Sequence, residues 1–203
     1  MNAGKTLFAQ LVDFLPWSTF SHYVSHYGGD KGARTLSCAE QFRIMASPQL
    51  TYRESLRDIE VSLSVQASKL YHMGFREPIR RSTLVDANES RDCRIHADFA
   101  TRLIIQARKL RASEDLGLEL SNTVYVLDST TIDLCLSAFP WRHIRKTKAA
   151  VEMHTLLDLR GGIPSFLHVS NGKWHDVHAL DVLTPEAGAI YVTDRGYADF
   201  ARL

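Results

Sequence analysis

Hydrophobic residues follow two different periods along the chain. In the first half they recur every three to four positions, as on a stripe over residues 4–15 that predicts a helix ended by Pro16. From Thr123 onward they form short apolar runs that alternate with polar or glycine-containing breaks, a pattern typical of strands. The change of period predicts an α/β protein with an all-α domain over residues 1–118 and a mixed α/β domain over residues 119–203.

Capping residues divide the first half into short helices. Ser37-Cys38-Ala39-Glu40 has the capping-box pattern and predicts a helix that ends at Ser47-Pro48, and Thr51-Tyr52-Arg53-Glu54 opens the next helix. A third short helix is expected over residues 64–72, and a longer one begins at Ser82. Three short helices with tight breaks suit a helix-turn-helix unit, although such triplets also occur in proteins that never touch DNA.

Strands separated by turns, with a helix before the last strand, are expected in the second half. In order, they are strands over 123–128, 150–158 and 163–170, a helix over 176–183 and a strand over 189–194. Gly161-Gly162 predicts a hairpin between the second and third strands, and the helix predicts a crossover that returns the fourth strand parallel to the first. This strand order is that of a ribonuclease-H-like core, and it places the ends of the first and fourth strands side by side.

An aspartate ends each of those two strands. Asp128 follows the apolar run Val124–Leu127, and Asp194 follows Ile190–Thr193. Two carboxylates a few ångströms apart repel each other and together hold a hard divalent cation, Mg²⁺ or Mn²⁺. Such an ion suits in-line attack on a phosphodiester. The pair therefore predicts a metal-dependent phosphoryl-transfer site, whereas either aspartate alone is explained as well by the cap of a turn.

Other polar residues near these strands leave alternatives open. Asp158 and Asp176 are candidates for the third acid of a compact metal nuclease, but an antiparallel second strand would place Asp158 far from the first aspartate. His175 and His178 would need a third zinc ligand that the sequence does not identify, so a helix cap by Asp176 with exposed histidines is the preferred interpretation. His154 is interpreted either as a phosphate contact or as a core histidine with satisfied hydrogen bonds.

The distribution of charge narrows the function further. The formal net charge of +1 argues against a uniformly basic nucleic-acid protein, and the positive charge is instead local. A basic segment follows the first aspartate, and we expect it to lie along a DNA backbone without sequence preference. An arginine after the second aspartate is expected to pair with phosphate or with a site carboxylate. These DNA-binding candidates are Arg142, Arg145, Lys146, Lys148 and Arg195.

Cysteine usage and hydropathy indicate the compartment. The three cysteines are widely separated and fit neither a zinc-ligand pattern nor a disulfide framework. No apolar run is long enough to span a membrane, and no signal-peptide organisation follows Met1. We therefore expect a cytoplasmic protein with no membrane partner.

Several segments resemble the DDE transposases of bacterial insertion sequences, of the insertion-sequence-four type. In the second half the matching segments are Tyr125–Thr130, Lys148–Asp158 with Met153-His154-Thr155, Ile163-Pro164 and Tyr191–Tyr197. The last is the most specific, because aspartate-arginine-glycine-tyrosine after a strand is a hallmark of the family. The helical half resembles the domain that precedes this core in one subgroup, through Ser55–Ile59, Lys69–Gly74, Arg81–Leu84 and Ala87-Asn88.

The resemblance implies a two-metal enzyme that cuts element ends and joins them to target DNA, with Asp128 and Asp194 as the first two acids of its triad. The third acid of the family is a glutamate in a tyrosine-x-x-arginine-x-x-x-glutamate helix, which has no match after Asp194. We therefore expect a truncated chain with an incomplete ribonuclease-H-like core that is inactive alone. Homo-oligomers or mixed oligomers with a complete transposase are expected, and the alternative function is a DNA-binding or dimerising remnant that inhibits the complete enzyme.

Overall fold

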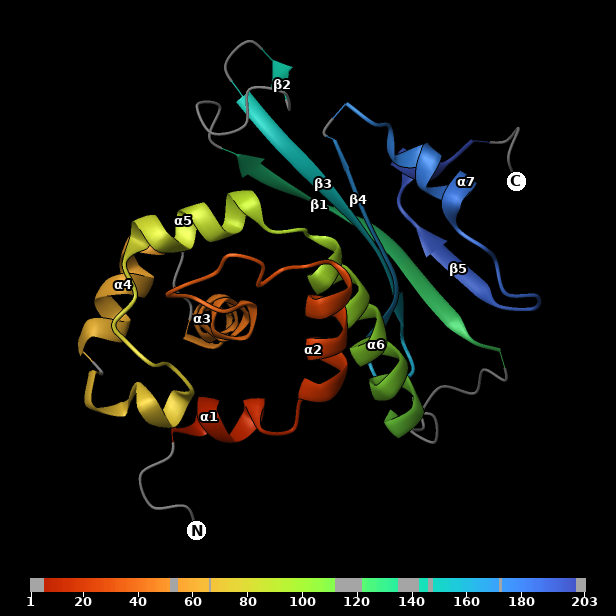
Figure 1. The fold of residues 1–203 in the computed structure, drawn as a ribbon. Coiled ribbons are helices and arrows are strands. Elements are labelled where there is room, and N and C mark those ends of the chain that lie inside the picture. The colour runs from red at the N-terminus through yellow and green to blue at the C-terminus, as the bar shows by residue number, and fades with distance from the viewer. Residues whose placement is uncertain are drawn as a thin grey trace. The chain divides into compact units, whose positions relative to one another are not determined.

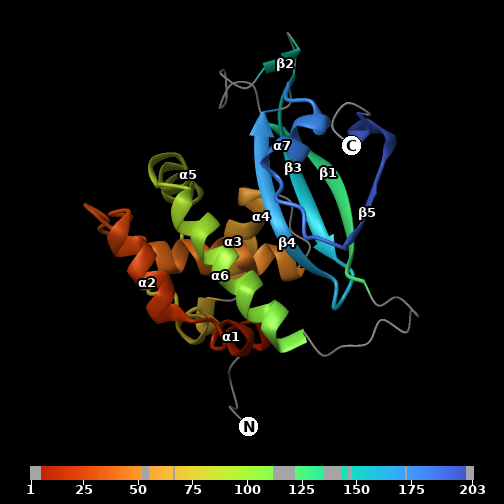
Figure 2. The ribbon, with the colours of Figure 1, turned by 90° about the vertical axis from the view of Figure 1, so that its right-hand side faces the viewer.

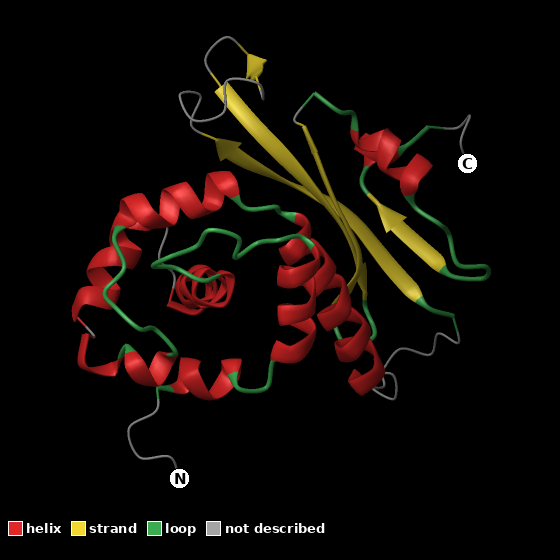
Figure 3. Cartoon of the chain, viewed as in Figure 1, coloured by secondary structure: helices red, strands yellow, loops and turns green. Residues whose placement is uncertain are grey.

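The chain divides into two compact units, Met1–Thr101 and Arg102–Leu203. A computed structural model describes residues 6–51, 55–65, 67–111, 122–134, 143–145, 148–171 and 173–199. Helices form the first unit, and strands with short helices form most of the second (Figure 3). The domain boundary predicted at residue 118 lies outside the described residues and stays a prediction.

The N-terminal unit consists of helices and turns (Figure 1). They are α1 (Leu7–Val12), α2 (Trp17–His26), α3 (Cys38–Thr51), α4 (Leu56–Val65), the 3₁₀ turns η1 (Ala67–Lys69) and η2 (Tyr71–Met73), α5 (Arg81–Ser90) and the start of α6 (Arg94–Arg111). Ile44 and Leu84 lie at the centre of one apolar cluster, and the rings of Phe20 and Phe99 meet edge to face at 4.9 Å in another. Within the described ranges, no helix is long and apolar enough to cross a membrane.

The first capping box forms as predicted at the start of α3. The Ser37 Oγ accepts the Glu40 N–H at 3.2 Å, and the Glu40 carboxylate accepts the Ser37 N–H at 2.9 Å. The predicted end at Ser47-Pro48 is wrong, because α3 continues to Thr51. Pro48 lies inside the helix and is buried, although a proline there removes one backbone hydrogen bond.

The boundaries of the next helices also differ from the prediction. The sequence predicts a capping box at Thr51, but Thr51 ends α3, and Ser55 caps α4 by accepting the Asp58 N–H at 3.1 Å. The helix predicted over 64–72 is replaced by the end of α4 and the two 3₁₀ turns. Gly74 ends the second turn at φ +85°, a left-handed conformation that glycine adopts at little cost.

The long helix predicted from Ser82 is in fact two helices, α5 and α6. Arg91 has extended backbone angles, which end α5. Asp92 then accepts the Arg94 N–H at 2.9 Å and starts α6. The apolar stripe continues across this break, which is why the period alone does not reveal it.

The C-terminal unit holds a mixed sheet with short helices after two of its strands. The elements are β1 (Val124–Leu134), β2 (His143–Arg145), β3 (Lys148–Asp158), β4 (Ile163–Asn171), η3 (Asp176–His178), α7 (Ala179–Val182), β5 (Ile190–Thr193) and η4 (Arg195–Tyr197). β1 pairs antiparallel with β3 along one edge and parallel with β5 along the other, while β4 and β2 pair with β3 (Figure 2). The predicted hairpin, crossover and ribonuclease-H-like strand order are therefore confirmed.

The first strand is longer than predicted. The sequence predicts that it ends at Asp128, but β1 continues to Leu134 and pairs with β3 along this extension. Threonine is favourable in strands, so Thr130 and Thr131 extend the pairing although they are polar. Asp128 is consequently a residue within a strand rather than at its end.

Short helices cover one face of this sheet. Leu127 and Leu156 are register partners on β1 and β3, and both are buried. They pack in one cluster with Ala179 of α7 and Tyr197 of η4. This cluster fixes the segment after β5 against the face of the sheet that carries Leu127.

Candidate functional site

Two adjacent parallel strands carry the two predicted aspartates. Asp128 follows Leu127 on β1, and Asp194 follows Thr193, the last residue of β5. Leu127 and Thr193 are register partners, so the aspartates come one residue later on each strand. Neighbouring strands lie roughly 4.8 Å apart, so the two backbones are close at this point. Both aspartates are exposed.

Each aspartate also has a local backbone partner. The Asp128 carboxylate accepts the Ser129 N–H at 2.8 Å, and the Asp194 carboxylate caps η4 by accepting the Gly196 N–H at 2.8 Å. The capping role considered for Asp194 is therefore present. Since a carboxylate has two oxygens and about four lone-pair sites, one local hydrogen bond leaves it able to bind a metal ion.

Asp158 lies at the other end of β1, as the antiparallel pairing predicts. Its register partner is Tyr125, and its carboxylate accepts the Arg160 N–H at 2.9 Å. The Arg108 guanidinium lies 3.4 Å from the same carboxylate. Asp158 is thus engaged away from Asp128 and is not available as a third acid beside it.

A buried chain of polar groups lies beneath the segment that follows β5. The Tyr197 hydroxyl is 3.3 Å from Nδ1 of His154, and the other ring nitrogen of His154 is 3.1 Å from the Ser170 Oγ. His154 is 0% exposed and Tyr197 is 1% exposed. The interpretation of His154 as a satisfied core histidine is confirmed, and its interpretation as a phosphate contact is wrong because the ring is wholly buried.

Tyr197 connects this buried chain to the two predicted aspartates. Burial raises the pKa of the Tyr197 phenol to about 12, while a hydrogen bond from Ser129 lowers it. The nearby charges of Asp176, Asp128 and Asp194 raise this pKa as well. One phenol therefore lies within electrostatic range of three carboxylates.

A second group of acidic and imidazole side chains converges at this place. Glu152, His154 and Asp176 each offer a ligand atom, and these atoms all lie within 4.8 Å of one another. The predicted helix cap by Asp176 is wrong, because His175 occupies the cap position without a side-chain hydrogen bond. Asp176 instead directs Oδ1 to within 3.7 Å of the His154 Nδ1.

The zinc site considered for His175 and His178 is not supported by the geometry. Among the described residues, the group of converging metal-ligating side chains contains neither histidine. Sequence reasoning considered His154 and Asp176 separately and missed Glu152. The available signal is the spacing of Glu152 and His154, since residues two apart on a strand point to the same face.

The structure describes only some of the predicted DNA-binding residues. Arg195 is exposed in η4, immediately after Asp194. The backbones of Arg145 and Lys148 pair between β2 and β3. Arg142 and Lys146 lie outside the described residues. Contacts of these side chains with DNA stay predictions.

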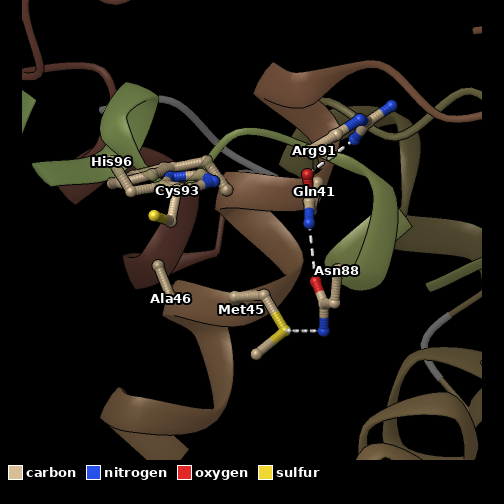
Figure 4. Close-up of a pocket in the computed structure, with 8 residues that line it drawn as sticks. Gln41, Met45, Ala46, Asn88, Arg91, Cys93 and His96 are labelled. Carbon is tan, nitrogen blue, oxygen red and sulfur yellow. Dashed lines mark hydrogen bonds between the residues drawn. The ribbon is translucent and has the colours of Figure 1, made fainter. Parts of the chain in front are cut away.

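A pocket in the N-terminal unit is mainly apolar (Figure 4). It has a volume of about 390 Å³ and is lined by Gln41, Phe42, Met45, Ala46, Asn88, Arg91, Cys93 and His96. The Gln41 amide donates to the Asn88 carbonyl oxygen at 2.6 Å, and Arg91 donates to the Gln41 oxygen at 2.7 Å. Because these polar groups bind one another, the pocket does not present an arrangement for catalysis.

Comparison with known families separates the same two parts of the chain. Residues 3–76 match a domain of unknown function, DUF4372. Residues 119–203 match the transposase DDE domain. A search among curated proteins found no match. The second matching segment contains the whole sheet with Asp128 and Asp194, so this part of the chain is similar to the transposase DDE domain.

Proposed function

We propose that this chain acts in DNA transposition of the insertion-sequence-four type and contributes two acids to a metal-dependent phosphoryl-transfer site. The similarity of residues 119–203 to the transposase DDE domain supports DNA as a partner and a divalent metal as a cofactor. The observation that carries the proposal is the register of β1 and β5. It pairs Leu127 with Thr193, the residues that directly precede Asp128 within β1 and Asp194 just after β5.

The donor set of these two residues suits Mg²⁺ or Mn²⁺. Both carboxylates are exposed, so an ion between them would keep positions for water and for phosphate oxygens, as Mg²⁺ prefers. Asp128 and Asp194 would hold the metal, and bound divalent metal would supply positive charge for activating the attacking oxygen and stabilising the leaving oxygen. The protein fixes the two carboxylates on strands, and the N–H groups of Ser129 and Gly196 orient them.

DNA would approach the exposed side of this pair. Arg195 is exposed beside Asp194, and the basic segment that contains Arg145 and Lys148 follows β1 in the chain. We assign phosphate contacts to Arg195 and to Arg142, Arg145, Lys146 and Lys148. We place this function in the cytoplasm, where cysteines remain reduced, and Cys38 and Cys93 are both free.

A polypeptide of these 203 residues should bind DNA without cutting it. A complete two-metal clamp needs a third carboxylate beside Asp128 and Asp194. Assembly with a complete transposase would supply that group, so mixed oligomers are part of the proposal.

Paramagnetic broadening by Mn²⁺ tests the metal site. In ¹⁵N-labelled protein, backbone signals of residues 127–129 and 194–196 should broaden first, and Asp128→Asn or Asp194→Asn should abolish this. Asp181→Asn, which changes an exposed acid on α7, is the matched control and should leave it intact. Equal broadening in the Asp128→Asn and Asp194→Asn variants would refute the site.

A gel-shift and nicking assay tests the DNA chemistry. With DNA from the ends of the element that encodes this chain, we expect a shifted complex with or without Mg²⁺ and no strand cleavage. Mg²⁺-dependent nicking that Asp128→Ala abolishes would contradict the expected inactivity. It would favour the compact nuclease instead, with Asp176 as its third acid.

A further inference from the structure

Three side chains below the proposed catalytic pair have the composition of a metal site. Glu152 and His154 lie two residues apart on β3 and therefore on one face of the sheet. Asp176 reaches them from the first position of η3, after β4. One ligand atom from each residue lies within 4.8 Å of the others. Two carboxylates and one imidazole thus converge from two separate segments.

The hydrogen bonds of His154 prepare one ring nitrogen as a ligand. Ser170 Oγ lies 3.4 Å from the Asn171 carbonyl oxygen, to which it donates, so it accepts a hydrogen bond from His154 Nε2 at 3.1 Å. We assign the proton of the neutral ring to Nε2 on this basis. The lone pair of Nδ1 then faces both the Tyr197 hydroxyl at 3.3 Å and Asp176 Oδ1 at 3.7 Å, so a metal ion on Nδ1 would take the place of the Tyr197 proton. A histidine that ligates a metal commonly has its other nitrogen fixed in this way.

The Oε2 atom of Glu152 is buried and has no hydrogen-bond partner within the described part of the chain. A bound dication would relieve the repulsion between the carboxylates and satisfy the orphan oxygen.

We propose that Glu152, His154 and Asp176 bind one first-row transition-metal dication of the Zn²⁺ class. An imidazole ligand favours such ions over Mg²⁺, which prefers oxygen ligands and water. Three protein ligands leave at least one coordination position open. The Asp176 side chain is 30% exposed and provides the route by which the ion enters. This proposal does not depend on the DNA chemistry proposed above.

The site is separate from the Asp128 and Asp194 pair but touches the same loop. Side chains alternate along β1, so Asp128 points to the face opposite Ser129, the register partner of His154. On the other side, a Cβ at Gly196 would lie 3.0 Å from the Asp194 Oδ1 and 3.2 Å from the Asp176 Oδ2. The absence of a side chain at Gly196 lets both carboxylates approach the loop. A metal held by Asp176 would therefore order the loop that carries Asp194.

Zn²⁺ titration against a chromophoric chelator tests the site. The titration is made in a protein carrying Asp128→Asn and Asp194→Asn, so that the proposed catalytic pair contributes no binding. We expect one Zn²⁺ per chain. Glu152→Gln or Asp176→Asn should weaken binding by more than the roughly 10- to 100-fold that loss of an outer-shell partner costs. Asp181→Asn, an exposed acid nearby, should leave the affinity unchanged.

A Co²⁺-loaded sample gives a second readout that does not require changing the buried histidine. If His154 ligates through Nδ1, its Nε2 proton should give one paramagnetically shifted, slowly exchanging signal in the ¹H NMR spectrum. That signal should disappear in Glu152→Gln and Asp176→Asn. Parental Zn²⁺ affinity in both variants would overturn the proposal. So would Zn²⁺ binding that disappears with the Asp128 and Asp194 changes alone, because the ion would then occupy the other pair.

Discussion

Removing a single hydroxyl group tests whether the buried chain holds the segment after β5. Tyr197→Phe keeps the ring that packs with Leu127 and Ala179, so little cavity is created. The change leaves Nδ1 of His154 without its partner at 3.3 Å, at a position that is 0% exposed. An unsatisfied buried polar group costs about 1–3 kcal/mol. We expect the free energy of local opening of the sheet to fall by that amount.

Native-state hydrogen exchange measures this local opening directly. Exchange is the appropriate assay because the chain has two compact units, and a single unfolding transition would not report on one of them. Since about 1.4 kcal/mol corresponds to a factor of ten, amides of β3 should exchange roughly 5- to 140-fold faster in Tyr197→Phe. The measurement is made with a chelator present, so that bound metal does not contribute. Tyr71→Phe is the control, because the Tyr71 side chain is 84% exposed.

Two results would refute this reasoning. Unchanged exchange along β3 in Tyr197→Phe would mean that the hydroxyl contributes no net stability to the sheet. Equal acceleration in the helices of the N-terminal unit would mean that the change acts on the whole chain. The expected pattern is acceleration confined to β3 and the strands that pair with it.

Three further predictions concern the N-terminal unit. Burial lowers the pKa of His96 below its ordinary value of 6.5, so the unfolded chain takes up a proton at a higher pH than the folded chain does. The N-terminal unit should therefore lose stability as the pH falls below 6.5. The free energy of unfolding by urea should differ less between about pH 7.5 and about pH 5.5 in His96→Gln than in the parent protein. Gly29→Ala would place a Cβ 2.5 Å from Ile95 Cδ1 and 2.7 Å from Cys38 Sγ, and this overpacking should lower the urea midpoint by the equivalent of about 1–3 kcal/mol. Burial raises the pKa of the Cys38 thiol to about 12, so iodoacetamide at neutral pH should label the exposed Cys93 and spare Cys38. Mass spectrometry of tryptic peptides from the native protein would reveal labelled Cys38 if this is wrong.

In the helical unit, features that depend on residues close together in the chain could be predicted from the sequence. The Ser37 capping box is one, because its two hydrogen bonds join residues three apart. The break at Arg91 is different. Its guanidinium donates to the Gln41 side chain and to the Leu36 carbonyl, and it lies 3.8 Å from Asp30. Since these partners lie far earlier in the sequence, no local sequence pattern predicts that the helix ends there.

The same distinction explains what was found and missed in the candidate site. The glycine hairpin and the crossover helix are local features, and together they predict the strand order that places Asp128 near Asp194. Glu152 was missed because a single acid on a strand is not by itself a signal of a metal site. Its significance appears only when Asp176, from a segment beyond β4, is placed beside it.

The residues that follow the two aspartates anchor the segments of the site to the core. Ser129, immediately after Asp128, forms a hydrogen bond with the Tyr197 hydroxyl. Tyr197 belongs to the same short motif as Asp194 and bonds to His154. Each acid is therefore followed by a polar group that anchors its segment to one buried histidine. Because the anchors lie on the covered face and Asp128 points to the opposite face, loss of an anchor should loosen the geometry of the carboxylate pair without removing either charge. This arrangement predicts that Tyr197→Phe weakens Mn²⁺ broadening near Asp128 and Asp194 less than Asp128→Asn does. An effect as large as that of Asp128→Asn would show that the phenol itself contacts the ion.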